Sequence, residues 1–213
     1  MQFGVDEAGK GPVLGSLFAA AVRADPAALP DGVADSKALA PARREELAAR
    51  LRDAGDVSVG VAEIPPARID DSGTDMNTLT VAAQAEALAA VARDGDAGVV
   101  DAGDTDAVRF GRRVADRVDA AVDVTAEHGA DERHALVSAA SVVAKVARDD
   151  HVAALGAEYD RPLGSGYPSD PTTREFLRTY VAEHGGLPDC ARESWATSRD
   201  VLAAAEQSAL GEF

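Results

Sequence analysis

Aromatic residues and cysteine are scarce in this chain, and long apolar runs are absent. Aromatic side chains make up 4% of the 213 residues, so the 46% hydrophobic content must build a core mainly from Val, Ala and Leu. The single cysteine, Cys190, excludes an internal disulfide and a thiolate zinc cluster. No apolar stretch approaches the roughly 18 residues of a membrane-spanning helix, and Asp6 and Glu7 interrupt any signal peptide. We therefore expect a soluble, cytoplasmic protein with one sizeable domain or one domain and a helical appendage.

Lysine is almost absent, and the charge balance is strongly acidic. The basic residues are arginines apart from Lys10, Lys37 and Lys145, and the formal net charge is −16. Such a charge normally argues against a nucleic-acid partner, because phosphates are repelled. The acidic residues are spread along the whole chain between small, Ala-rich positions, which suits hydration in concentrated salt, where the Debye length falls to roughly 3 Å at about 1 M. We interpret the acidity as salt adaptation rather than as evidence about a substrate.

The apolar pattern predicts strands first, then alternating helices and strands, then helices. Strands are expected at 2–5, 17–22, 57–64, 98–101 and 121–125, and helices at 41–52, 80–93 and 135–155. This order predicts an α/β fold, a mixed β-sheet flanked by helices, with a helical C-terminal part.

Two adjacent carboxylates, Asp6 and Glu7, follow the first predicted strand within the segment VDEAGKGP at residues 5–12. In a regular strand, neighbouring side chains point to opposite faces. The glycines that follow permit a backbone bend, which we expect to bring both carboxylates to one side and to leave backbone N–H groups open for a ligand. Taken alone, these residues also fit an acidic surface turn.

The segment resembles the opening motif of the ribonuclease HII family, DEAGRGP, and the resemblance continues over nearly the whole chain in the family's order. The further matching segments are DSKAL (35–39), MNTL (76–79), VDAG (100–103), AD (130–131) with SAASVVAKVARD (138–149), GSGYPSDP (164–171) and RESW (192–195). The last two match archaeal-type members best. The resemblance implies a ribonuclease H-like fold and an endoribonuclease that cuts the RNA strand of RNA–DNA hybrids, and also cuts at ribonucleotides in duplex DNA, to leave a 5′-phosphate and a 3′-hydroxyl.

The resemblance assigns catalysis and metal binding to a set of carboxylates: Asp6, Glu7, Asp101 and Asp131. Hard oxygen ligands suit Mg²⁺ or Mn²⁺. Two such ions about 3.5–4 Å apart can stabilise both the attacking and the leaving oxygen of an in-line displacement. Without the resemblance, Asp131 would be an ordinary solvated acid, and we interpret the nearby Asp104 and Asp106 as surface charges.

The resemblance also assigns residues to the substrate. The set is Gly9, Lys10, Gly11, Lys37, Asn77, Ser138, Lys145 and Tyr167. The backbone of residues 9–11 resembles the element that contacts the 2′-hydroxyl, and Tyr167 resembles the tyrosine that packs on the deoxyribose beyond the RNA–DNA junction; a loop tyrosine on Pro168 is the alternative. Lys10 stands where the family usually has arginine, so the planar guanidinium is lost. The related ribonuclease HIII family shares the Gly-Lys-Gly sequence, but its members carry an extra N-terminal domain. This sequence has no room for such a domain before the first predicted strand, so we expect type HII.

Lys37 and Lys145 fall inside motifs and can meet phosphates as point charges. Ser138 and Ser141 recur with Lys145 at helical spacing, and helix packing and phosphate contact stay equally open for the two serines. The four histidines show no zinc spacing, so we interpret them as surface or hydrogen-bonded side chains. Trp195 is interpreted as a core anchor of the C-terminal helices.

The C-terminus carries a separate pattern, with Gln207, Leu210 and Phe213 spaced three apart. It resembles the peptide that binds sliding clamps, although its usual second aromatic is missing. A helical turn would present Leu210 and Phe213 together to an apolar pocket; a frayed amphipathic tail is the alternative. We accordingly divide the chain into a catalytic domain (1–155), a C-terminal loop and helical region (156–206) and a clamp-binding tail (207–213).

Two other functions remain open. A non-catalytic nucleic-acid-binding module would keep the fold, but it has no need to keep the carboxylates together. Another two-metal nuclease of the same fold, such as a resolvase or exonuclease, would lack the Gly-Lys-Gly segment and Tyr167 that match the 2′-hydroxyl reader. Nothing in the sequence requires more than a monomer.

Overall fold

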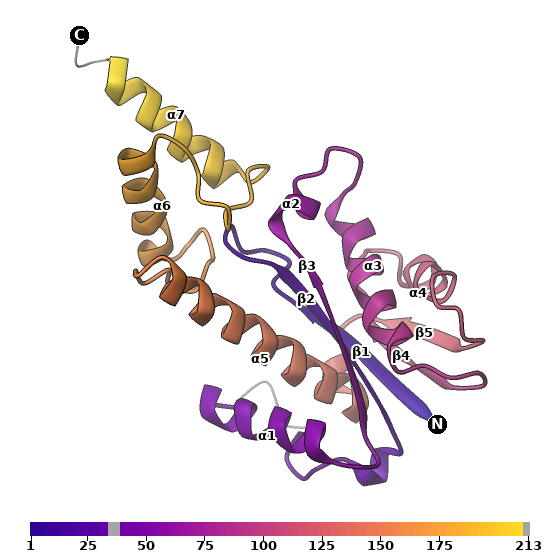
Figure 1. The fold of residues 1–213 in the computed structure, drawn as a ribbon. Coiled ribbons are helices and arrows are strands. Elements are labelled where there is room, and N and C mark those ends of the chain that lie inside the picture. Colours follow the sequence, from indigo (N-terminus) through magenta and orange to yellow (C-terminus); the bar gives the residue numbers. More distant parts are fainter. Residues whose placement is uncertain (34–38, 211–213) are drawn as a thin grey trace. The chain divides into compact units, whose positions relative to one another are not determined.

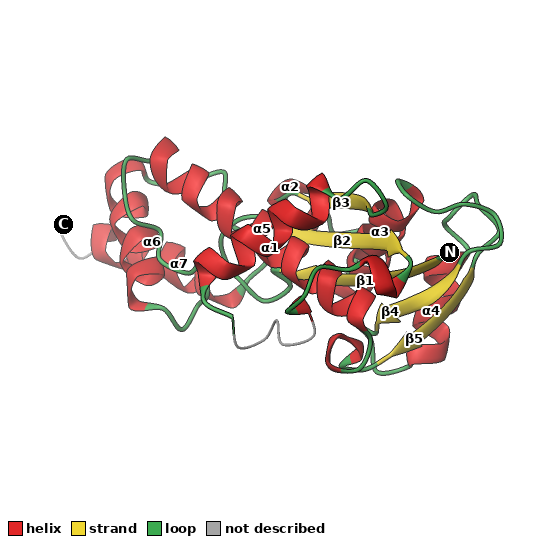
Figure 2. Ribbon diagram, turned by 90° about the horizontal axis from the view of Figure 1, so that it is seen from below, coloured by secondary structure: helices red, strands yellow, loops and turns green. Residues whose placement is uncertain are grey.

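The structure of the protein, a computed structural model, describes residues 1–33 and 39–210, with the backbone alone at 208–210. Strands and helices are mixed, which confirms the predicted fold class (Figures 1 and 2). The strands are β1 (Gln2–Ala8), β2 (Leu17–Ala24), β3 (Ser58–Ile64), β4 (Ala97–Asp101) and β5 (Asp123–Glu127). The helices are α1 (Pro41–Asp53), α2 (Pro66–Ile69), α3 (Met76–Ala89), α4 (Ala107–Ala115), α5 (Ala135–Glu158), α6 (Pro171–His184) and α7 (Ala196–Leu210), with short 3₁₀ turns η1 (Pro26–Ala28) and η3 (Ala130–Glu132).

The five strands form one sheet in the order β3-β2-β1-β4-β5. β1 pairs with β2 antiparallel, whereas β1 with β4 and β4 with β5 run parallel. Parallel neighbours end at the same edge of a sheet, so the carboxyl ends of β1, β4 and β5 lie together. Val5 is opposite Val100 in the register, which places Asp6 and Asp101 as the next residues at this edge.

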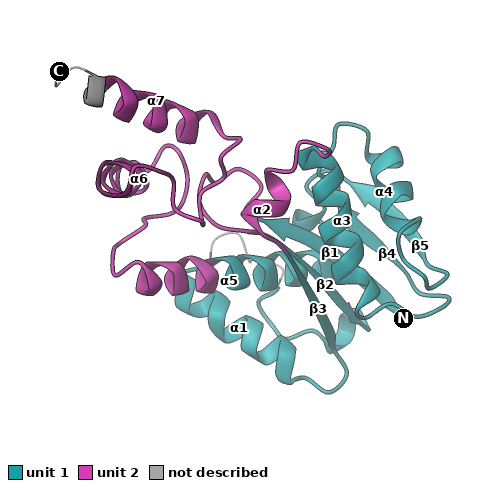
Figure 3. Cartoon of the chain, turned by 45° about the horizontal axis from the view of Figure 1, so that its top comes forward, with its two compact units in different colours: residues 1–8, 17–63, 75–148 teal, residues 9–16, 64–74, 149–213 magenta. Residues whose placement is uncertain are grey.

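Helices cover both faces of the sheet, with α1 and the first part of α5 on one face and α3 and α4 on the other (Figures 1 and 3). The first face is packed with small side chains: Ala20, Val22 and Ala24 of β2 share a buried cluster with residues of α1 and α5. This Ala-, Val- and Leu-rich core agrees with the scarcity of aromatics. A Cβ on Gly4 of β1 would lie 2.2 Å from the backbone of Leu136, so α5 touches the strand itself.

The chain divides into two compact units, shown in different colours in Figure 3. Unit 1 comprises residues 1–8, 17–63 and 75–148, and unit 2 comprises residues 9–16, 64–74 and 149–213. The chain passes from one unit to the other several times. Unit 2 therefore consists of the loop after β1, a segment around α2 and the C-terminal part. The linear domain division made from the sequence stays a prediction.

Unit 2 has the more aromatic core. Tyr159 meets Phe176 and Tyr180 edge to face, with ring centroids 5.4 and 5.7 Å apart. Helix α6 begins where Asp170 accepts a hydrogen bond from the Thr172 N–H and Pro171 occupies the first turn. No helix in the described part of the chain is long and apolar enough to cross a membrane.

Several boundaries differ from the sequence-based ones, and two helices, the short α2 and α4, were missed. Helix α3 begins at Met76 rather than at residue 80, because the Asp75 carboxylate accepts the Thr78 N–H and caps it. Helix α4 was not predicted, since Gly111 interrupts its short apolar stripe. Strand β1 runs on to Ala8, three residues beyond its predicted end.

We predict that Gly4→Ala destabilises the protein by about 1–3 kcal/mol or more, because the added methyl group collides with backbone of α5 that cannot move alone. Urea unfolding followed by circular dichroism measures the free energy of unfolding. Gly55→Ala is the matched control, since a Cβ there meets nothing within 4 Å. Equal stability of the two variants would show that α5 does not lie against β1.

Candidate active site

Asp6 is a buried carboxylate at the end of β1. Its side chain is 6% exposed, its Oδ1 accepts the Glu7 N–H at 2.7 Å, and it is hydrogen-bonded to the side chain of Ser141 on α5. Burial raises the pKa of Asp6 to about 7, and the negative charges of Asp101 and Asp131 add to the increase. The hydrogen bonds from Ser141 and Glu7 oppose it only in part.

Asp6 and Glu7 point to opposite faces of the sheet, which corrects the expected bend. The ladder with β2 stays regular through both residues, with Asp6 opposite Ala20 and Glu7 opposite Ala19. Asp6 bonds Ser141 on α5, whereas the Glu7 carboxylate accepts a hydrogen bond at 2.5 Å from the Gln84 amide on α3. The alternation of a regular strand therefore prevails over the freedom that the following glycines allow.

Asp101 and Asp131 are joined through the backbone. Asp101 ends β4, and its Oδ1 accepts the Ala130 N–H at 2.6 Å. Ala130 begins the 3₁₀ turn that carries Asp131. Since both aspartates raise the pKa of Asp6, the structure brings Asp6, Asp101 and Asp131 into one electrostatic cluster at the carboxyl ends of β1 and β4.

A second layer of side chains supports Asp6 from α5. The Lys145 ammonium donates to Ser141 Oγ at 2.8 Å, so a hydrogen-bonded chain runs from Lys145 through Ser141 to Asp6. Lys145 therefore contacts Ser141, a partner that the predicted role in phosphate binding did not include. Ser138 is 1% exposed and donates to the Val33 carbonyl at 2.6 Å, a position that favours packing over phosphate contact.

The carboxylates suit a divalent cation by their chemistry. Oxygen ligands of this kind bind Mg²⁺ and Mn²⁺, and a cation among Asp6, Asp101 and Asp131 would relieve their repulsion. Among the described residues, no group of three or more aspartate, glutamate, histidine or cysteine side chains is placed to hold a metal ion. The donor set fits, and ligand geometry would have to be completed by side-chain movement, water and substrate phosphate.

Unit 2 brings two of the proposed substrate elements together. The Gly166 carbonyl accepts the N–H groups of Val13 and Leu14, which ties the loop after β1 to the segment that carries Tyr167. Between the loop after β1 and the segment that carries Tyr167, the distance is short: a Cβ on Gly11 would lie 3.5 Å from the Tyr167 ring. Tyr167 is 41% exposed, which leaves part of its ring accessible to a ligand.

Arg192 is a site residue whose role the sequence did not reveal. It is fully buried, and its guanidinium donates to the carbonyls of Gly9, Lys10 and Gly15 at 2.6, 3.1 and 2.9 Å. It also lies 4.9 Å from the ring centre of Trp195, whose indole N–H donates to the Gly11 carbonyl. The RESW motif was the sequence signal that could have revealed this role. Its Arg192 and Trp195 hold the loop at residues 9–11, and Trp195 also packs against the helical core.

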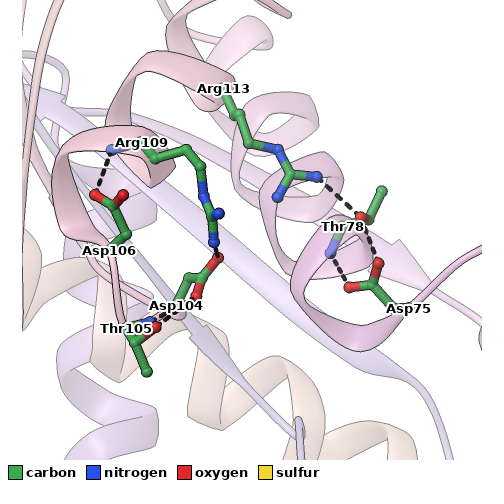
Figure 4. A network of polar contacts seen from close by, with 7 residues as sticks. All are labelled: Asp75, Thr78, Asp104, Thr105, Asp106, Arg109 and Arg113. Carbon is green, nitrogen blue, oxygen red and sulfur yellow. Dashed lines mark hydrogen bonds and ion pairs between the residues drawn. The ribbon is translucent and has the colours of Figure 1, made fainter.

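The residues beside Asp101 in sequence form a separate polar network (Figure 4). Asp104 is buried and ion-paired with Arg109 at 2.7 Å, so its interpretation as a surface charge was wrong. Asp106 is exposed and caps α4 by accepting the Arg109 N–H. Arg113 donates to the Thr78 hydroxyl at the start of α3, where Asn77 lies half-buried in the first turn. This network fixes the α3 and α4 ends against each other.

The remaining predicted site residues are placed as follows. Lys37 and Phe213 lie outside the described residues, as does the side chain of Leu210, whereas Gln207 is exposed on α7. His134 bonds Glu127 at 3.1 Å, and His151 accepts the Ser16 N–H, in line with the interpretation of these two as hydrogen-bonded histidines.

A mixed sheet with aspartates gathered at the carboxyl ends of adjacent parallel strands defines a protein of the ribonuclease H-like class. The family model described as Ribonuclease HII matches residues 3–198. The chain belongs to the ribonuclease HII family, as the sequence motifs predicted.

Individual relatives agree with this family. A ribonuclease HII of the haloarchaeon Haloarcula marismortui is 70% identical over 213 residues, covering 100% of both chains. The ribonuclease H2 structure from Pyrococcus horikoshii OT3 is 36% identical, with a TM-score of 0.88 over 97% of this chain and 99% of that one. The PCNA:RNase HII complex from Archaeoglobus fulgidus gives 36% identity and a TM-score of 0.83, covering 94% and 96%. The chain is thus a ribonuclease H of type HII, and enzymes of this family use divalent metal ions.

We predict that Asp6→Asn stabilises the protein at pH 8 in the absence of divalent ions. A carboxyl whose pKa is higher in the folded than in the unfolded chain takes up a proton on folding, so the stability it contributes falls as the pH rises from about 4 to about 7. An uncharged amide removes this loss, roughly 2–4 kcal/mol at pH 8 and little near pH 4.

The free energy of unfolding in urea at both pH values, measured with a chelator present, checks this. Asp119→Asn, at an exposed aspartate, serves as the control and should change nothing. A variant that is less stable than the wild type at pH 8 would contradict the buried, charge-crowded state of Asp6.

Proposed function

We propose that this chain is an endonuclease that cuts the RNA strand of RNA–DNA hybrids and cuts at ribonucleotides embedded in duplex DNA, by hydrolysis with two divalent ions. The products would carry a 5′-phosphate and a 3′-hydroxyl. The observation that carries this proposal is the cluster of Asp6, Asp101 and Asp131 at the carboxyl ends of β1 and β4, in a chain of the ribonuclease HII family.

In this proposal the cluster of Asp6, Asp101 and Asp131 holds the cations, and Glu7 contributes from the opposite face of the sheet at the end of β1. Bound divalent ions supply Lewis-acid chemistry: activation of a water and stabilisation of the departing 3′ oxygen. The protein's own part is to place the ligands. Asp6 is held by Ser141, and the backbone at Ala130 holds Asp101, so these carboxylates keep their positions before any substrate binds.

Selectivity for RNA is assigned to unit 2. The 2′-hydroxyl distinguishes RNA from DNA and both donates and accepts hydrogen bonds. Arg192 and Trp195 already engage the carbonyls of Gly9, Lys10 and Gly11, so the loop would meet the hydroxyl through its backbone N–H groups. The exposed Tyr167 ring beside Gly11 would pack on the neighbouring deoxyribose.

We also propose that the acidic surface is an adaptation to concentrated salt. Phosphate contacts weaken steeply with salt, because binding them releases counterions. A cytoplasmic enzyme that works in concentrated salt would depend on close packing and on cation bridges more than on surface charge. The net charge of −16 and the 70% identity to a haloarchaeal relative support this interpretation.

We predict that the wild-type protein cuts a labelled DNA duplex with one ribonucleotide on the 5′ side of that residue, with Mn²⁺ or Mg²⁺ in high salt. Asp101→Asn should reduce the rate by at least about 10²-fold, since it removes a charged cation ligand. Gel analysis of the products measures both effects, with Asp119→Asn as the control.

Each other outcome has a definite meaning. Cleavage of long hybrids without cleavage at the single ribonucleotide would remove junction recognition from the proposal. A folded protein that cuts neither substrate would favour the non-catalytic binding module, and DNA cleavage without any ribonucleotide would favour another nuclease of this fold.

We further propose that the C-terminus binds a sliding clamp through Gln207, Leu210 and Phe213. The support is the exposure of Gln207 on α7, the spacing of the three residues, and the relative from Archaeoglobus fulgidus, whose structure is a PCNA:RNase HII complex. An apolar plug presented by a short helical turn is a known mode of docking into a groove.

We predict that Leu210→Ala together with Phe213→Ala weakens binding to the sliding clamp of the same organism by at least about 10-fold, because truncating the hot-spot residues of an interface costs more than about 1 kcal/mol. Isothermal titration calorimetry measures the dissociation constant. Arg199→Ala, at an exposed position earlier on α7, is the control. Equal affinities of all three proteins would leave the tail without this role.

A further inference from the structure

Gln84 is a buried amide on α3 that contacts two of the proposed cation-binding residues. It is 0% exposed, and the nearby positions Ala83, Ala87 and Leu88 of the same helix are also buried and apolar. Its Nε2 donates to Glu7 Oε2 at 2.5 Å and to the backbone carbonyl of Asp101 at 2.8 Å. Burying an amide in apolar surroundings is costly unless it is hydrogen-bonded, so these two bonds account for its presence on this face.

The chemistry of the partners fixes which way the amide faces. The Asp101 carbonyl can only accept a hydrogen bond, and an ionised Glu7 carboxylate also only accepts. A flipped amide would set Oε1 against both acceptors. In the observed orientation Oε1 is buried and has no hydrogen-bond partner among the described residues. The structure therefore leaves the acceptor unused and keeps both donor contacts.

The amide confines Glu7 from one side, and the backbone confines it from the other. A Cβ on Gly103 would lie 3.2 Å from Glu7 Oε1, so the chain passes close to the second carboxylate oxygen. Glu7 is at the end of β1, and Asp101 is at the end of β4. Through one nitrogen, Gln84 thus links a ligand side chain on one strand to the backbone of a ligand residue on the next.

We propose that Gln84 is a positioning residue that fixes Glu7 for divalent-cation binding. This inference rests on the proposed function of the carboxylates. Ser141 holds Asp6 on the α5 face of the sheet, and Gln84 holds Glu7 on the α3 face, so each of the two adjacent carboxylates has its own support from the helix that covers it. Outer partners of this kind orient ligands and tune metal affinity.

The test is Gln84→Met, which keeps the length and volume of the side chain but removes its donors. Isothermal titration with Mn²⁺ alone, without nucleic acid, should show a dissociation constant raised about 10- to 100-fold. At saturating Mn²⁺ the KM for a ribonucleotide-containing duplex should stay unchanged while kcat falls. Thr80→Val is the matched control. It removes a buried hydroxyl of the same helix, which donates to the Met76 carbonyl, and it should leave Mn²⁺ affinity as in the wild type.

Gln84→Glu is the second variant, and it covers the case in which Gln84→Met does not fold. It keeps the shape of the amide but sets a carboxylate against Glu7, so Mn²⁺ binding should weaken at least as much in a protein whose circular dichroism is unchanged. Wild-type Mn²⁺ affinity in either folded variant would overturn the role of Gln84. Loss of Mn²⁺ binding in Asp101→Asn but not in the Gln84 variants would leave the proposed function intact and remove this inference alone. A wild-type protein that neither binds Mn²⁺ nor cuts would remove both.

Discussion

The burial of Asp6 beside two further carboxylates is the constraint on which the arrangement of unit 1 depends. Asp6 is nearly inaccessible to water, and Asp101 and Asp131 both act on it unfavourably. The fold holds them together by hydrogen bonding and packing: the parallel pairing of β1 with β4, the hydrogen bond from the Ala130 N–H to Asp101, and the close approach of α5 to Gly4. Stability is given up at these positions, as is common where a site must bind a cation. The rest of unit 1, including its Ala-rich core, keeps α5 and α3 close enough to the sheet for Ser141 and Gln84 to reach the carboxylates.

Unit 2 differs from unit 1 in its proposed role and in the residues that build it. Its core contains most of the aromatic contacts, and its buried Arg192 organises backbone carbonyls instead of carboxylates. Arginine suits this task because its planar fork offers several donors in fixed directions. The loop held by Arg192 follows β1 directly in the chain, so Asp6 and Glu7, proposed for chemistry, lie only one residue before the 9–11 segment proposed for ribose recognition, although the two belong to separate compact units.

Much of the fold followed from the sequence, and the reasons for success and failure are local. The long apolar periodicity of α5 predicted its first residue, Ala135, because nothing in the segment competes with the helix. The family motifs selected Asp6, Asp101 and Asp131, which the structure gathers. Strand alternation alone would have placed Asp6 and Glu7 on opposite faces, but the glycines that follow suggested a bend that the regular ladder does not make. Gln84 gave no signal, since one glutamine in an Ala-rich helix is an ordinary residue until its partners from β1 and β4 are known. Asp104 was misjudged because its partner, Arg109, becomes a neighbour only when α4 forms.

The central claim is that Asp6, Asp101 and Asp131 form a site for divalent cations at the carboxyl ends of β1 and β4. The most direct measurement is anomalous X-ray diffraction from crystals of the wild-type protein grown with Mn²⁺. We expect anomalous density for Mn²⁺ among these carboxylates, within about 2.0–2.3 Å of their oxygens. Density for Mn²⁺ only elsewhere on the protein, in crystals whose dissolved protein still cleaves its substrate, would contradict it.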